Sequence, residues 1–264
     1  AHVFLSEDQK WRIAVTPEEI DPAYLRALVC LEDRRFYVHS GVDGAAVLRA
    51  LATNVGRRRI VSGASTLTMQ LARMLVPRPR SFSAKLRQAL LAIKLEQRLS
   101  KAEILAAYLR FLPFGHNVEG VEAAALSYFG HRASALSPAE IATLLAVPQD
   151  PTHRFPSAAH TRALQGARDR VAERLLGCDA LPLGQGSGRL TGAQVLRQIH
   201  DTPVPDALQP FPRAAMHASM WLQQGHAGQA RLLTTLDRGV QRNVERIVQA
   251  AQAEMARKGI HNTE

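Results

Sequence analysis

The chain has 264 residues, a formal net charge of +10 and only 5% aromatic residues. This length allows one large domain, or one domain with an appendage, and the low aromatic content favours packed helices over sheets. The charge suits nucleic acid, anionic lipid headgroups or a pyrophosphate group, so by itself it excludes none of them. No run approaches the ~18 apolar residues of a membrane span, so we expect any anchor helix to lie outside this chain.

The first residues, around Val3–Leu5 and Trp11–Val15, are expected to form short extended segments. Thr16, with Glu19 three residues later, is a capping-box pattern that predicts a short helix or turn. Asp21 then predicts the N-cap of a longer helix, because the proline that follows it suits the first helical turn.

This helix carries an acid on its apolar face. Leu25 and Leu28 define the face, and Glu32 follows them at i+7 and i+4. A carboxylate in that place is either paired or partly neutral, and a partly neutral carboxylate suits proton transfer near neutral pH. The alternative is an ordinary salt bridge from Glu32 to Arg34 or Arg35.

The two cysteines provide neither a metal-binding spacing nor a disulfide framework. Cys30 is expected to be a small buried apolar residue. A bridge to Cys178 is the less favoured alternative.

The residues from the acid onward form a dense motif, Glu32-Asp33-Arg34-Arg35-Phe36-Tyr37-x-His39-x-Gly41-Val42-Asp43. It resembles the first signature of the peptidoglycan glycosyltransferases. These are the transglycosylase domains of class A penicillin-binding proteins and their monofunctional relatives. The resemblance implies that Glu32 is catalytic and that Asp33, Phe36 and His39 bind substrate.

A second motif follows a predicted helix over 44–55 and a basic loop at 57–59, which is either a solvated turn or a contact for phosphate or lipid. The motif is Ser62-Gly63-Ala64-Ser65-Thr66-Leu67-Thr68-Met69-Gln70-Leu71-Ala72-Arg73. Small residues before a helix leave backbone N–H groups that can bind an anion, although an ordinary serine N-cap explains the pattern equally well. The motif resembles the family's second signature, which implies substrate contacts from Ser65, Thr66 and Gln70. Met69 stands where many members have a glutamine.

Residues 74–83 combine apolar side chains, prolines and arginines, which suits either a mobile loop or a segment resting on a membrane surface. The helix predicted over Ala84–Leu99 begins with a segment that resembles the third signature, Arg-Lys-x-x-Glu. This implies that Lys85 and Gln88 bind substrate. Ala84 replaces the arginine, and Gln88 replaces the acid but cannot carry charge. The segment is most similar to the penicillin-binding protein 1C type.

Ser100 and Glu103 form another capping box, which opens a helix that resembles the fourth signature. Lys101 and Tyr108 are in register with that signature, which implies a substrate contact from Lys101. Arg110 replaces the asparagine of the family pattern.

Further amphipathic helices are expected over 120–129, 137–147 and 161–176. The last of these resembles the fifth signature through Arg168-x-x-Val171-x-x-Arg174-Leu175. Arg168 is therefore the candidate for a pyrophosphate contact, and a solvated surface arginine is the alternative.

After these helices the composition changes, and residues 184–188 and 203–212 are linker-like. A short helix is expected between them, over 191–199. Arg231–Leu236 is expected to form a strand, and Asp237 is expected to cap a final helix whose apolar face needs a partner.

No Ser-x-x-Lys motif of a penicillin-binding transpeptidase occurs in the chain. We therefore expect a glycosyltransferase domain over 1–180. Residues 181–264 are expected to be a linker and the start of a missing or lost transpeptidase domain.

The resemblance implies a mainly helical, lysozyme-like fold with two lobes, followed by a C-terminal linker strand and helix. It implies a hexosyltransferase that polymerises lipid II into β-1,4 glycan strands, with inversion and release of undecaprenyl diphosphate. Glu32 would accept the proton of the attacking 4-hydroxyl, while Lys85, Arg168 and the start of the Ser65–Gln70 helix would stabilise the departing pyrophosphate. A divalent cation, Mg or Mn, could share that work, and no residue is assigned as its ligand.

The implied location is the outer, periplasmic face of the bacterial inner membrane. The implied partners are lipid II, the growing glycan strand, the membrane surface and other cell-wall synthesis proteins, and nucleic acid is not among them. Two other functions remain open. One is a lysozyme-like glycan hydrolase, which also needs buried carboxylates. The other is a non-catalytic scaffold that binds lipid II, which Ala84 and Gln88 suggest.

Overall fold

The computed structural model describes residues 3–48, 65–77, 81–183, 190–226, 229 and 231–259. The described part is mainly helical, which confirms the predicted fold class. It divides into two compact units. One unit is Leu5–Pro210, and the other combines Ala1–Phe4 with Phe211–Glu264.

The larger unit contains helices and two short strands, β1 (Trp11–Arg12) and β2 (Val118–Glu119), which pair in parallel. Residues 44–48 are also helical, and the rest of the helix predicted over 44–55 lies outside the described residues. The other elements in chain order are η1 (Pro17–Glu19), α1 (Pro22–Glu32), α3 (Leu67–Leu75), α4 (Phe82–Glu96), α5 (Lys101–Phe111), α6 (Val121–Phe129), α7 (Pro138–Ala146), η2 (Val147–Gln149), α8 (Pro151–Arg154), α9 (Thr161–Gly177) and α10 (Gly192–Asp201).

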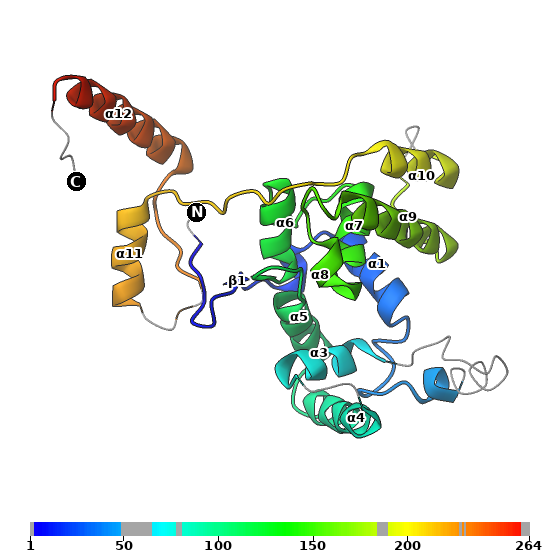
Figure 1. The fold of residues 1–264 in the computed structure, drawn as a ribbon. Helices are drawn as coiled ribbons and strands as arrows, with labels where there is room; N and C mark the ends of the chain where they lie inside the picture. Colours follow the sequence, from blue (N-terminus) through cyan, green and yellow to red (C-terminus); the bar gives the residue numbers. More distant parts are fainter. Residues whose placement is uncertain are drawn as a thin grey trace. The chain divides into compact units, whose positions relative to one another are not determined.

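These helices form two groups within the unit. In one group, α7 packs against α9, and α1 and α10 pack against both of them. In the other group, α3 packs against α4 and α5. Figure 1 shows α3, α4 and α5 at the lower end of this unit, with α1, α7, α8 and α9 above them. The chain passes from the first group to the second between α1 and α3, so the acid at the end of α1 lies where the two groups meet.

The helix starts predicted at Asp21 and Ser100 are confirmed, because each has the side-chain cap that its sequence suggested. The helix predicted from Ala84 begins earlier, at Phe82, with Ser81 as its cap. Asp21 accepts a hydrogen bond from the Ala23 N–H at 2.8 Å, which fixes the start of α1. Ser100 and Glu103 form the capping box of α5, in which the Ser100 N–H donates to the Glu103 carboxylate at 2.7 Å. These caps satisfy N–H groups that have no partner within the helix.

The larger unit extends beyond the boundary that the sequence suggested at residue 180. Val195 and Ile199 of α10 are 1% and 2% exposed, because this helix packs on α7 and α9. The compact unit therefore continues to Pro210. That residues 181–264 lead into a transpeptidase domain stays a prediction.

The smaller unit contains α11 (Met216–Gly225) and α12 (Arg238–Arg257). Asp237 caps α12 as predicted, accepting the Val240 N–H at 2.8 Å. The predicted strand at Arg231–Leu236 is wrong, because these residues take no strand structure and Leu233 is 86% exposed. A strand needs a paired neighbour for its backbone groups, and local sequence does not supply one.

Cys30 and Cys178 form a disulfide, with their Cα atoms 6.6 Å apart and 148 residues apart in sequence. The expectation that Cys30 is a free buried residue is therefore wrong. The pairing follows from tertiary structure. Because α1 packs against α9, Cys30, near the end of α1, lies beside Cys178, which directly follows α9. In the described ranges, no helix is both long enough and apolar enough to cross a membrane.

Candidate active site

Glu32 is the last residue of α1, and its side chain is half-buried. The Gln70 side-chain amide, from α3, donates a hydrogen bond to Glu32 Oε2 at 3.0 Å. The Tyr108 hydroxyl, from α5, donates to Gln70 Oε1 at 3.1 Å. Three elements therefore meet at one carboxylate, and the side-chain hydrogen bond that it accepts from the described residues uses one of its two oxygens.

The alternative of a simple salt bridge from Glu32 is not what the structure shows. Arg34 donates its Nε–H to the Cys30 carbonyl at 3.3 Å, and Arg35 pairs with Asp43 at 3.4 Å. Both arginines point to other partners, so the charge of Glu32 is left for another task.

Two buried tyrosines lie near Glu32. Burial raises the pKa of Tyr108 well above its usual value, and the negative charge of Glu32 adds to the effect. The pKa of Tyr24 is raised for the same two reasons. Both hydroxyls therefore keep their protons at any working pH. The Tyr24 hydroxyl is buried, and it has no hydrogen-bond partner among the described residues.

Asp33 follows Glu32 but has a different environment, being 7% exposed. Its Oδ2 accepts the backbone N–H of Leu67 at 3.0 Å, and His39 Nε2 lies 2.9 Å from the same oxygen. The Gly41 N–H donates to His39 Nδ1 at 3.2 Å, so the imidazole proton is on Nε2 and points at Asp33. Asp33 therefore joins the turn after α1 to the start of α3.

The backbone N–H groups at the start of α3 are bonded within the protein. Thr66 caps the helix by accepting the Met69 N–H at 3.1 Å, and its own hydroxyl donates to the Gly41 carbonyl at 2.6 Å. With the Leu67 N–H bonded to Asp33, two of the first three N–H groups are used internally. The prediction that this helix start binds a substrate anion is corrected, since the anion next to it is the Asp33 carboxylate.

Gly41 is required where the turn crosses α4. Its φ is +92°, and a Cβ there would lie 2.8 Å from backbone atoms of Ala92. Any other residue would both strain the backbone and push the turn away from α4. The glycine thus sets the place of the Gly41 carbonyl, which Thr66 binds.

A second polar cluster joins α3, α4 and α5. Glu96 Oε1 accepts hydrogen bonds from Thr68 at 2.6 Å and from the Lys101 ammonium at 2.7 Å. Lys101 also donates to the His39 carbonyl at 2.7 Å, and its ammonium lies 4.6 Å from the centre of the Phe36 ring. Because the Glu96 side chain is only 6% exposed, this pair stabilises the base of the site rather than its surface.

With this geometry in hand, comparison with known proteins identifies the family. The family described as Transglycosylase matches residues 2–176 of the chain. The chain belongs to the transglycosylase family.

Three relatives illustrate how far the similarity reaches. Penicillin-binding protein 1C of Escherichia coli (strain K12) is 38% identical over 247 residues, which cover 93% of this chain and 30% of that protein. Penicillin-binding protein 1A of Aquifex aeolicus (strain VF5) is 41% identical over 166 residues, 62% of this chain and 23% of the relative. Penicillin-binding protein 1A of Escherichia coli (strain K12) is 32% identical over 244 residues, 91% and 28% respectively. The chain thus spans about a third or less of the length of these relatives.

Several residues that the signatures of the transglycosylase family predicted as substrate contacts have internal roles here. Phe36 is fully buried, and His39 and Asp33 are buried and bonded to each other. Thr66 is 2% exposed, and Lys101 is engaged as described above. The structure gives each of these five residues an internal contact that holds the site together, and their contact with substrate stays a prediction.

Other predicted residues remain available to a substrate. Ser65, before α3, and Lys85, in the first turn of α4, are exposed, and Gln88 is half-buried one turn further along. Their contact with substrate stays a prediction. Ser62, Gly63 and Ala64 of the second signature lie outside the described residues, as does the basic loop at 57–59.

Arg168 is not at the candidate site. Its side chain is fully buried, and its guanidinium donates to the carbonyls of His200, at 3.3 Å, and Thr202. It also pairs with Asp169 at 2.9 Å. The predicted pyrophosphate contact is therefore corrected, because Arg168 joins α9 to the end of α10 instead.

The described residues do not by themselves form a divalent-cation site, and a role for such a cation stays a prediction. Among the described residues, no group of three or more His, Cys, Asp or Glu side chains is placed to hold a metal ion. Asp33 has both oxygens engaged, and Gln88 has no charge to offer. We therefore derive no catalytic step through a metal.

Sequence reasoning gave no role to Thr68, Glu96 or Gly41. A contact of Glu96 could have been predicted from the sequence, because Glu96 lies on the same polar side of α4 as Lys85 and Gln88. Such a row predicts a polar contact but does not say which helix provides the partner.

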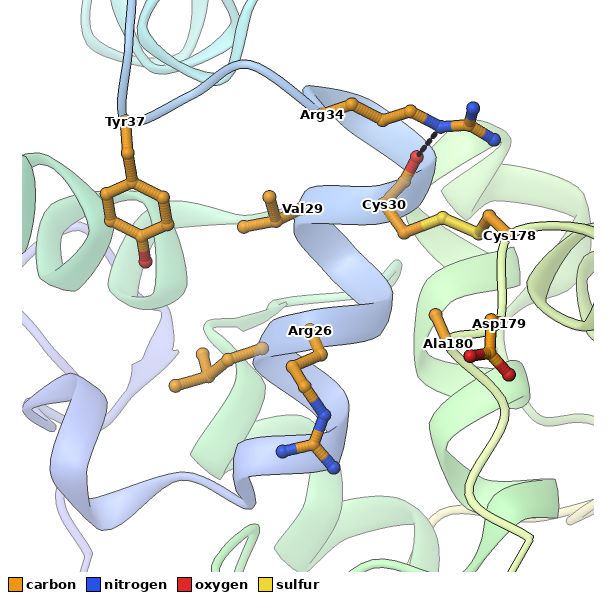
Figure 2. Close-up of a pocket in the computed structure, with 9 residues that line it drawn as sticks. Arg26, Val29, Cys30, Arg34, Tyr37, Cys178, Asp179 and Ala180 are labelled. Atoms are coloured by element: carbon orange, nitrogen blue, oxygen red, sulfur yellow. Dashed lines mark hydrogen bonds between the residues drawn. A yellow bond between two sulfur atoms is a disulfide. The ribbon is translucent and has the colours of Figure 1, made fainter.

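A hollow of about 490 Å³ lies beside α1 and includes the disulfide (Figure 2). Arg26, Arg34 and Tyr37 are among its lining residues, and Glu32 is not. Figure 2 shows Arg34 donating to the Cys30 carbonyl above the bond to Cys178. The disulfide therefore borders an open hollow that does not include Glu32.

Proposed function

We propose that this chain is a peptidoglycan glycosyltransferase that polymerises lipid II into β-1,4 glycan strands, with inversion and release of undecaprenyl diphosphate. The observation that carries the proposal is the state of Glu32. It is a half-buried carboxylate with one oxygen bonded to Gln70, while Arg34 and Arg35 are engaged elsewhere. Membership of the transglycosylase family supports the reaction class.

In this reaction Glu32 acts as the general base. It accepts the proton of the 4-hydroxyl of one lipid II molecule as that oxygen attacks the anomeric carbon of the growing strand. The bond from that carbon to the diphosphate breaks on the opposite face, which gives inversion. Glu32 Oε2 already accepts from Gln70, so Oε1 is the oxygen open to the substrate.

The departing diphosphate needs positive charge. With Arg168 buried in the α9–α10 contact, Lys85 is the described candidate that remains exposed for this purpose. Ser65 provides a hydroxyl donor on the approach to α3. Placing a cation at the leaving group stabilises charge that develops in the transition state.

The substrate and the growing strand are lipid-linked, so the enzyme works at a membrane surface, on the periplasmic face of the bacterial inner membrane. The outward face of α4 supports this, because Leu86, Leu90 and Ile93 are 56%, 53% and 37% exposed. Basic residues lie beside them on the same helix. Apolar side chains flanked by basic ones suit an interface with anionic lipid headgroups.

The test is polymerisation of labelled lipid II by the purified chain in detergent, resolved by gel electrophoresis. The wild-type chain is expected to produce long glycan, and Glu32→Gln is expected to lower the rate by about 10²-fold to 10⁴-fold, because proton transfer is lost. Glu173→Gln is the matched control, since Glu173 is exposed on α9 and should leave the rate unchanged.

Two other outcomes would point elsewhere. Cleavage of finished glycan, lost in Glu32→Gln, would indicate a lysozyme-like hydrolase. Binding of lipid II without any turnover would indicate a scaffold, which Ala84 and Gln88 would then explain, because they remove two charged groups of the third signature.

A further inference from the structure

The Glu32 carboxylate ends a short chain of hydrogen bonds. Tyr108, buried on α5, donates to Gln70 Oε1 at 3.1 Å, and Gln70 Nε2 donates to Glu32 Oε2 at 3.0 Å. Both polar atoms of the Gln70 amide are thus engaged inside the protein. The family resemblance implied a substrate contact for Gln70, but in this arrangement its hydrogen-bonding groups point at Glu32 and Tyr108.

The donor-to-acceptor direction of these two hydrogen bonds is fixed at both ends. An ionised carboxylate can only accept hydrogen bonds, so the NH₂ group of the amide must face Glu32. The amide oxygen then faces Tyr108, which donates because burial raises its pKa and keeps the hydroxyl protonated. A reversed amide would place its oxygen against the carboxylate, which is repulsive.

We propose that Gln70 and Tyr108 are positioning residues, which hold the Glu32 carboxylate with Oε2 capped and Oε1 turned to the attacking hydroxyl. This inference rests on the proposed function and deepens it. The Gln70 amide supplies the hydrogen bond that fixes Oε2, and Tyr108 prevents the amide from reversing.

The other groups around Glu32 do not replace this arrangement. The charge of Glu32 raises the pKa of Tyr24, on the same helix, but the Tyr24 hydroxyl makes no hydrogen bond among the described residues. Arg73, on α3, acts on Tyr108. Asp33 is turned to His39 and Leu67. Within the described part of the chain, Gln70 is therefore the side-chain donor that selects one oxygen of Glu32.

The test measures kcat and KM for lipid II polymerisation across pH, for the wild-type chain and three variants. Gln70→Glu places a second carboxylate beside Glu32, so the acid limb of the kcat profile is expected to move up by about one pH unit or more. Gln70→Met keeps the volume but removes the donor, and kcat is expected to fall about tenfold with KM within about twofold. Tyr108→Phe is expected to lower kcat by a smaller factor, because the amide loses its fixed orientation.

The matched control is Tyr128→Phe. Tyr128 is another buried tyrosine, whose hydroxyl donates to the Phe114 carbonyl. This variant removes a buried hydrogen bond elsewhere, so it can lower the melting temperature but should leave the acid limb in place. Melting curves of all variants separate loss of folding from loss of positioning.

Other results would overturn the inference. A rise in KM with the acid limb unchanged in the Gln70 variants would mean that Gln70 contacts substrate. If the wild-type chain makes no polymer, the proposed function fails, and the inference is then tested without turnover. In that case the ¹³C signal of the Glu32 carboxyl is titrated by NMR in the wild type and in Gln70→Glu. A higher midpoint in the variant supports the positioning role, and an equal midpoint refutes it.

Discussion

Two neighbouring carboxylates at the end of α1 have separate tasks, and the helix geometry separates them. Glu32 completes the helix and stays half-buried, and among the described residues its side chain accepts a hydrogen bond from Gln70. Asp33 is the C-cap, where the chain leaves the helix, and its side chain turns to His39 and the start of α3. Asp33 therefore fixes the backbone that carries Glu32, the proposed catalytic acid.

Asp33→Asn tests this structural task. The asparagine oxygen in the place of Oδ2 can still accept the Leu67 N–H. His39 Nε2 lies within hydrogen-bond distance of both Asp33 oxygens, so the NH₂ group that replaces Oδ1 would meet the Nε2–H, donor against donor. We expect a loss of about 1–3 kcal/mol in the free energy of unfolding, from urea denaturation. Asp201→Asn, at an exposed position at the end of α10, is the control and should change the free energy little. An unchanged stability in Asp33→Asn would contradict the structural role.

The sequence predicted Glu32 as the catalytic acid, which stays a prediction, and it did not predict the internal contacts that several neighbours make. A motif states which residue types occur together, and it does not state whether a side chain points outward or inward. Phe36 and His39 follow Glu32 by four and seven residues, yet both are buried. Only the partners that tertiary structure provides, such as Lys101 over the Phe36 ring, show that they support the site.

At the scale of elements, the connection from α6 to α7 is fixed by a charged contact. His131 Nε2 lies 2.9 Å from Glu140 Oε1, and His131 Nδ1 lies 3.0 Å from the Arg132 carbonyl oxygen. Partial burial acts to lower the pKa of His131, but the hydrogen bonds with Glu140 and the Arg132 carbonyl outweigh it and raise the pKa.

A raised pKa gives this contact a definite pH dependence. Its stabilisation is fully present below the ordinary histidine pKa of about 6.5 and is lost as pH rises through the raised value. The wild-type melting temperature should therefore fall slightly more between about pH 6 and about pH 8 than that of His131→Gln. The effect is small, because the His131 side chain is 44% exposed. An equal change in both proteins would show that the contact does not contribute.

Helix starts were predictable because each cap is a local pattern within four residues, as at Asp21 and Ser100. The strand at Arg231–Leu236 and the boundary at 180 were not, because both depend on distant partners. A strand needs a neighbour, and α10 belongs to the larger unit only because its apolar residues pack on α7 and α9.

At the scale of the larger unit, the Cys30–Cys178 disulfide closes a loop of 148 residues around most of the helices. The sequence could not predict the pair, since two isolated cysteines carry no spacing signal. The bond depends on α1 lying against α9. Because Cys30 is two residues before Glu32, the bond also anchors the helix that carries the proposed catalytic acid.

Cys30→Ala/Cys178→Ala is expected to lower the free energy of unfolding by about 2–4 kcal/mol, since the unfolded chain regains freedom. For a unit of this size the melting temperature should fall by roughly 5–15 °C. The wild-type chain in excess thiol reductant should approach the double variant, whose melting temperature should not respond to the reductant. A wild-type melting temperature that reductant leaves unchanged would contradict the contribution of the bond.

The larger unit has an exposed apolar surface on α4 that suits the proposed function, because an enzyme with a lipid-linked substrate must stay at the bilayer. The exposed apolar row on α4 consists of Leu86, Leu90 and Ile93, at successive turns of one helix face. Lys85 and Lys94 are exposed on the same helix and can contact anionic headgroups. If this face inserts, its apolar area contributes to binding separately from the charge.

Leu86→Ser/Leu90→Ser separates the two contributions, because it removes apolar area and leaves every charge in place. Each leucine is about half exposed, so inserting the pair is worth roughly 1.5 kcal/mol, and the variant should bind anionic vesicles about tenfold more weakly. Ala158→Ser, at an exposed position far along the chain, should bind like the wild type in the same cosedimentation assay. If the leucine variant binds equally well but raised salt abolishes binding of both proteins, the attachment is electrostatic and α4 does not insert.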